Sequence, residues 1–138
     1  MRRKPAPHAA GSSVVDVEVA NRSGMAVDEQ GAVEVARRVL EEEGIEEGEL
    51  GLAFVDAGEA RALKREHLGI DETPDVLSFP IDERDELPAG VPRQLGDIVL
   101  CPAVVGEEWR EPLVHGILHL LGYDHGREME AREEALRA

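Results

Sequence analysis

The sequence predicts a single α+β domain, in which helices pack on a mixed β-sheet of about four strands. Strand-like and helix-like segments follow the order strand, helix, strand, helix, strand, strand, and then only helices. A chain of 138 residues is long enough for one hydrophobic core and too short for two. Because aromatic residues make up only 3% of the chain, we expect an aliphatic core.

Four segments have the pattern of β-strands. They alternate in polarity or are rich in β-branched and other apolar residues, and turn-forming residues flank them. The predicted strands are residues 14–19, 50–55, 76–79 and 98–100. Residues 80–95, between the last two strands, are acidic and contain proline and glycine, so we expect a surface loop there.

Two helices are predicted between the strands. Asp28 is placed to cap a helix that runs to about Glu43. Asp56 and Glu59 have the spacing of a capping box for the next helix, and Gly69 is placed to end it. A charged helix over residues 127–137 is expected to close the domain of residues 13–138, whereas residues 1–12 have the composition of a flexible tail.

Three of the five histidines lie in a short segment near the C-terminus. His115 and His119 are four residues apart, so a helix places both imidazoles on one face. Gly122 is placed to end that helix, after which the chain can reverse and return His125 to the same point. Three nitrogen ligands with an open fourth position are typical of catalytic zinc. We therefore predict one zinc ion per chain, bound by His115, His119 and His125.

The histidine spacing is that of the metzincin signature H-E-x-x-H-x-x-G-x-x-H. Gly116 stands where that signature has its general-base glutamate, so the same spacing argues against peptide hydrolysis by the metzincin mechanism. No residue is identified as the general acid. Asp124 is expected either to orient a ligand or to act in catalysis, and Ser78 is expected to be structural. His67 is not expected to be a ligand.

The formal net charge of −15 argues, by itself, against a nucleic-acid partner, because phosphate binding requires a positive surface. If RNA is nevertheless the substrate, arginines such as Arg65 should lie near the site. The acidic residues 41–43 and 133–134 should then face away from it. No apolar run is long enough to span a membrane. The single cysteine, Cys101, allows no internal disulfide and favours a cytoplasmic location.

Three segments together resemble the YbeY family of bacterial metal-dependent endoribonucleases that act in rRNA maturation. They are DVLSFP (residues 75–80), LGDIVLC (residues 95–101) and HGILHLLGYDH (residues 115–125). The resemblance covers roughly residues 14–130. It implies an α+β domain and a zinc ion held by the three histidines. It also implies cleavage of single-stranded RNA, including rRNA precursors in 16S rRNA maturation, with ribosomal particles as partners in ribosome biogenesis and quality control.

The sequence departs from the family pattern at three places. Leu68 stands where many members have an arginine that is thought to matter for cleavage, and Arg65 lies one helical turn earlier. Pro74 replaces a threonine, and the segment between Cys101 and His115 is short, so the helix before the site should be clipped. Two alternatives to the RNA hydrolase stay open: a metal-dependent hydrolase of another substrate, such as a peptide, and a ribosome assembly factor whose zinc is mainly structural. The oligomeric state is also left open.

Overall fold

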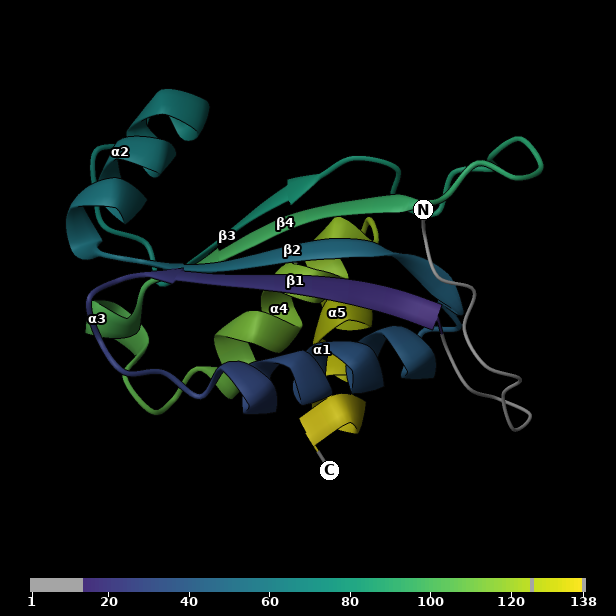
Figure 1. Ribbon diagram of the computed structural model, residues 1–138, viewed down its shortest axis with the longest axis horizontal. Helices are drawn as coiled ribbons and strands as arrows, with labels where there is room; N and C mark the ends of the chain where they lie inside the picture. The colour runs from purple at the N-terminus through teal and green to yellow at the C-terminus, as the bar shows by residue number, and fades with distance from the viewer. Residues whose placement is uncertain (1–13, 125, 138) are drawn as a thin grey trace.

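A computed structural model describes residues 14–124 and 126–137 as one four-stranded sheet with helices on both of its faces (Figure 1). The strands are β1 (Val14–Arg22), β2 (Glu47–Val55), β3 (Val76–Pro80) and β4 (Gln94–Leu100). The helices are α1 (Glu29–Glu42), α2 (Ala57–Leu68), α3 (Pro102–Val105), α4 (Arg110–Leu120) and α5 (Arg127–Arg137). The predicted α+β architecture is confirmed. The prediction of a tail over residues 1–12 lies outside the described residues.

The sheet is mixed and has the strand order β1-β2-β4-β3. β1 pairs parallel with β2 and β2 pairs parallel with β4, whereas β3 pairs antiparallel with β4 and forms an edge of the sheet. β4 begins at Gln94, earlier than predicted, because Gly96 lies within the strand instead of forming a turn before it. A Cβ atom on Gly96 would lie 2.2 Å from the carbonyl oxygen of Phe79, so the close approach of β3 and β4 requires glycine there.

Local capping signals determine where α1 and α2 begin. Asp28 accepts a hydrogen bond from the backbone N–H of Gly31 at 2.9 Å, and Asp56 accepts one from that of Glu59 at 2.8 Å. Only half of the predicted capping box forms, because the carboxylate of Glu59 instead pairs with Arg22 at 2.7 Å. The short helix α3 occupies the segment between Cys101 and α4, where the sequence predicts a clipped helix.

The core has two layers because apolar side chains alternate between the faces of the sheet. The larger layer lies between the sheet and the helices α1, α4 and α5, which gather on one face (Figure 1). The smaller layer lies on the other face, beneath α2, and includes Val55, Leu77, Val99 and Cys101. Cys101 is a free, buried thiol that packs as a small apolar residue. Within the described ranges, no helix combines the length and apolar character needed to cross a membrane.

Candidate metal centre

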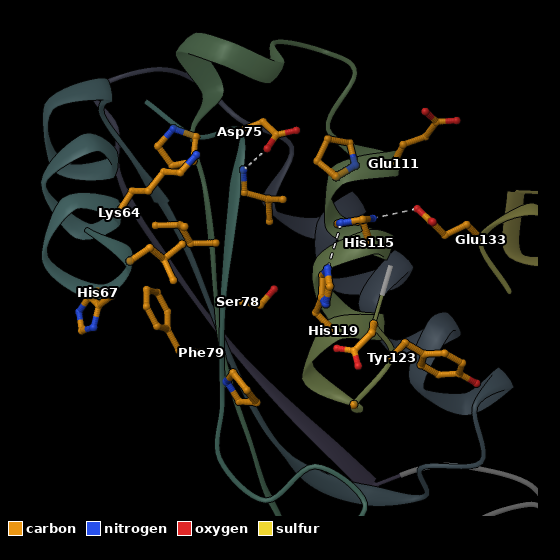
Figure 2. A pocket seen from close by; sticks show the side chains of 18 of the residues that line it. Lys64, His67, Asp75, Ser78, Phe79, Glu111, His115, His119, Tyr123 and Glu133 are labelled. Atoms are coloured by element: carbon orange, nitrogen blue, oxygen red, sulfur yellow. Dashed lines mark hydrogen bonds and ion pairs between the residues drawn. The ribbon is translucent and has the colours of Figure 1, made fainter. Parts of the chain in front are cut away.

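A cleft of about 1010 Å³ follows the free edge of β3, with α2 on one side and α4 on the other. Figure 2 shows Lys64 and Phe79 on one wall and the two histidines of α4 on the other. The cleft exists because α2 and α4 pack on opposite faces of the sheet and the sheet ends between them. The edge of β3, one face of α4 and the turn after α4 therefore line the same cavity.

His115 and His119 lie one turn apart on α4 and both line the cleft, as the spacing predicted. Their Nε2 atoms are 3.2 Å apart, and the rings meet nearly edge to face at an interplanar angle of 79°. Two nitrogens that bind one tetrahedral zinc ion at about 2.0–2.1 Å stand about 3.3 Å apart. The two imidazoles therefore have a separation that fits a shared metal ion.

The predicted third ligand, His125, lies outside the described residues, so the complete triad stays a prediction. Among residues 14–124 and 126–137, no three histidine, cysteine or carboxylate side chains converge in the way a metal site requires. His67 belongs to α2, and its ring packs edge to face on Phe79 with a centroid distance of 4.9 Å. His67 thus lies on the wall opposite the histidine pair (Figure 2), and its absence from the ligand set stays a prediction.

The carboxylate of Glu133 on α5 contacts Nδ1 of His115, the ring nitrogen that does not face His119. Its Oε2 lies 3.1 Å from Nδ1 of His115, and both side chains are about three-quarters buried (Figure 2). A proton on Nδ1 that is donated to this carboxylate leaves the lone pair on Nε2, which faces His119. The prediction that residues 133–134 face away from the site is wrong for Glu133, which lines the cleft. No local sequence pattern predicts this contact, because it depends on how α5 packs against α4.

Gly116 faces the sheet and not the cleft. A Cβ atom there would lie 3.0 Å from Val76 Cγ2 and 3.1 Å from both Ile98 Cδ1 and Ser78 Oγ. Ser78 Oγ also donates a hydrogen bond to the carbonyl oxygen of Gly116 at 2.9 Å. Position 116 is therefore closed to a catalytic carboxylate. The hydrogen bond to the α4 backbone supports a structural role for Ser78, which stays a prediction.

The charged side chains that line the cleft are mainly acidic, whereas an RNA substrate predicts arginines near the site. Five carboxylates line it: Asp75, Glu83, Glu111, Asp124 and Glu133. Among the described lining residues, Lys64 is the one lysine or arginine, and it also pairs with Glu72 at 3.1 Å. Arg65 is not a lining residue. It is exposed and lies 3.6 Å from Asp71, so the prediction that Arg65 lies near the site is not supported by a position in the cleft lining.

Leu68, which stands where the family pattern has an arginine, lines the cleft and is 58% exposed. Lys64 precedes it by four residues, so the two side chains share one face of α2. The cation on this wall is therefore Lys64. Asp124 also lines the cleft, and its two alternative roles stay open.

The fold and the histidine pair define a class of protein: a single α+β domain with a metal-type imidazole pair beside an edge strand. The comparisons identify the family. The family model described as Endoribonuclease YbeY matches residues 18–137, and the chain belongs to that family. The resemblance inferred from the three sequence segments is thereby confirmed.

Individual relatives agree with this assignment. The chain is 42% identical over 136 residues to Endoribonuclease YbeY of Acidothermus cellulolyticus, covering 85% of this chain and 83% of that protein. It is 39% identical over 139 residues to that of Salinispora tropica, covering 86% and 88%. The solution structure of TM1509 from Thermotoga maritima matches with a TM-score of 0.53 at 26% identity, covering 87% of this chain and 85% of that one. The chain is therefore an enzyme of the endoribonuclease class, a hydrolase acting on RNA.

Proposed function

We propose that this chain is a zinc-dependent endoribonuclease that cleaves single-stranded RNA, with rRNA precursors, including that of 16S rRNA, as its substrates. One observation carries the proposal. In a chain of the YbeY family, His115 and His119 face each other at 3.2 Å in the main cleft, and Glu133 holds the outer nitrogen of His115. This is the donor arrangement of a histidine-bound metal with a supporting carboxylate.

His115 and His119 would hold the ion through Nε2, and His125 is the predicted third ligand. A zinc ion held by these residues would act as a Lewis acid and would activate water near neutral pH. Glu133 keeps the lone pair of His115 on Nε2 and fixes the ring orientation. Gly116 allows α4 to approach β3 closely enough to form one wall of the cleft.

The opposite wall suits an unpaired strand. Phe79 and the exposed Leu68 present apolar surface there, on which unstacked bases can pack. Lys64 is placed to contact a phosphate from the same wall. The five carboxylates around the cleft oppose phosphate binding, so substrate affinity in the absence of metal should be weak.

The proposed substrate determines the expected partners and cellular location. We propose that the protein acts on ribosomal particles or their precursors in the cytoplasm, where rRNA precursors are found. A peptide substrate is disfavoured, because position 116 faces the sheet and cannot supply the metzincin glutamate to the cleft.

The test combines metal analysis with cleavage of labelled RNA. Purified protein should carry one zinc per chain and cut a single-stranded RNA faster than a duplex of the same sequence. His119→Ala should lose both the metal and the cleavage. His67→Ala should keep the metal stoichiometry, because that ring lies on the opposite wall.

Two results would argue against this function. Cleavage by metal-free His119→Ala at the wild-type rate would exclude the histidine pair from the reaction. Metal-loaded protein that binds ribosomal particles without cleaving RNA would instead favour an assembly factor with a structural zinc.

A further inference from the structure

A buried carboxylate lies behind the metal centre, outside the cleft. Glu43 follows the last turn of α1, and its side chain is only 2% exposed. Its neighbours Glu41 and Glu42 are exposed, whereas Glu43 is buried. None of the three lines the cleft, in line with the expectation that residues 41–43 face away from the site. Because a buried charge is costly unless it is paired and hydrogen-bonded, the partners of Glu43 must compensate for its burial.

Three side chains from three separate segments donate to this one carboxylate. Oε1 accepts from Arg84 Nη2 at 2.9 Å and from the Tyr123 hydroxyl at 2.8 Å. Oε2 accepts from Arg132 Nε at 2.7 Å, and Arg132 Nη2 is 2.5 Å away. A second Arg84 nitrogen donates to the backbone carbonyl of Glu43 at 3.1 Å. Each of these segments also borders the cleft.

Arg132 connects Glu43 to the histidine pair. The next residue on α5 is Glu133, whose carboxylate holds His115. The described core contacts of α5 are made by Met129 and Leu136. Apolar packing tolerates small shifts of a helix, whereas charge-assisted hydrogen bonds are directional. The contact between Arg132 and Glu43 therefore sets the position of α5 at which Glu133 reaches Nδ1 of His115.

Tyr123 connects Glu43 to the turn after α4. Tyr123 lines the cleft, and it precedes Asp124 and the predicted ligand His125 in the sequence. Its ring packs against the larger core layer and its hydroxyl donates to Glu43. The hydrogen bond thereby restrains the start of the segment that must supply the third ligand.

Arg84 connects Glu43 to the loop between β3 and β4. Its neighbour Glu83 lines the cleft and has a φ of +50°, the one positive φ of a non-glycine residue among those described. The carbonyl oxygen of Glu83 accepts from Arg93 Nη1 at 2.8 Å, so arginines hold the loop on both sides of this conformation. The Glu83 carboxylate lies against Gly122, at the turn after α4.

We propose that Glu43 is a positioning residue of the metal centre. It holds α5, the turn after α4 and the loop of Glu83 in one arrangement around the histidine pair. This inference rests on the proposed metal-dependent function and adds a residue that touches neither metal nor substrate. It predicts that removal of the Glu43 carboxylate weakens metal binding more than the accompanying loss of stability explains.

The test compares Glu43→Gln with a control of similar or greater instability, Leu40→Ala. Leu40 is fully buried on the same helix, belongs to the larger core layer and makes none of the hydrogen bonds to the Glu43 carboxylate. For each variant, the free energy of unfolding is measured in urea, and the affinity for Zn²⁺ is measured by competition with a chelator. The absorption spectrum of the Co²⁺-loaded protein reports the ligand geometry. This comparison is necessary because metal binding is linked to folding.

Glu43→Gln should weaken the Zn²⁺ affinity by about 10- to 100-fold, the range for supporting groups around a metal, and should change the Co²⁺ spectrum. Leu40→Ala should keep the Zn²⁺ affinity and the Co²⁺ spectrum near those of the wild type. Tyr123→Phe, which removes one hydrogen bond and keeps the ring, should give a smaller loss of affinity in the same direction. If Glu43→Gln does not fold, Tyr123→Phe alone tests the proposal.

The positioning role is overturned if Glu43→Gln and Tyr123→Phe bind Zn²⁺ like the wild type. It is also overturned if Leu40→Ala loses affinity to the same extent, because stability alone then explains the effect. In both cases, RNA cleavage by the zinc-loaded wild type leaves the proposed function standing. A wild-type protein that binds no metal would overturn both proposals.

Discussion

Oε2 of Glu133 lies 3.1 Å from Nδ1 of His115, although the two residues are 18 positions apart and belong to different helices. The orientation of one predicted metal ligand therefore depends on how α5 packs against α4. A carboxylate on the outer nitrogen of a ligating histidine fixes the tautomer and makes the inner nitrogen a better donor. The neighbouring residue Glu134 is exposed, so the pair offers a matched comparison.

Glu133→Ala should lower the affinity for Zn²⁺ by about 10- to 100-fold, because His115 loses the group that orients its ring. Competition with a chelator measures the affinity. Glu134→Ala removes the same charge one position along the helix and should leave the affinity unchanged. Equal affinities for the two variants would show that the carboxylate on His115 does not support the metal.

Lys64→Ala should weaken the binding of single-stranded RNA by similar factors for unrelated sequences, because a phosphate contact reads no bases. The slope of log K against log salt concentration should become shallower by about 0.7 for each phosphate that the lysine neutralises in the wild type. Filter binding at several salt concentrations measures both effects. Arg65→Ala is the control and should have little effect, because Arg65 does not line the cleft. The reverse result would restore Arg65 as the residue that binds phosphate.

Gly116→Ala should destabilise the fold, because its Cβ would meet Val76, Ile98 and Ser78 at 3.0–3.1 Å. Overpacking of this kind costs about 1–3 kcal/mol, against a gain of at most about 1 kcal/mol in helix propensity. Urea unfolding measures the difference. Gly58→Ala, in α2, would meet only Asp56 Oδ1 at 3.3 Å and should be neutral or stabilising. A Gly116→Ala protein as stable as the wild type would mean that α4 can move away from β3.

Tyr123 is the only tyrosine in the chain, so tyrosinate absorbance reports on this residue alone. Burial, and then the hydrogen bond to Glu43, raise its pKa above the usual value near 10. Since the folded-state pKa exceeds the unfolded one, the stabilising contribution is fully present below about pH 10 and is lost as the pH rises through the folded-state pKa. Alkaline titrations of the folded and urea-unfolded protein should therefore give a higher midpoint for the folded form. Coincident midpoints would contradict the buried contact.

Local patterns in the sequence were sufficient for much of the fold. Asp28 and Asp56 cap their helices as predicted, because a cap depends on residues only a few positions away. The four-residue spacing of His115 and His119 places both on one face of α4 for the same reason. Three short segments were enough to identify the family. The second half of the predicted capping box does not form, because the Glu59 carboxylate pairs with Arg22 on β1.

Only the tertiary structure decided which charged residues belong to the site. Lys64 and Arg65 are consecutive and similar in charge, but successive residues point about 100° apart around a helix. The packing of α2 on the sheet selects Lys64 for the cleft. Glu43 and Glu133 stand in acidic runs that look like solvated surface, and each is held by partners from another segment. Such contacts join residues far apart in sequence, so no local pattern predicts them, and the tertiary packing of helices and loops determines them.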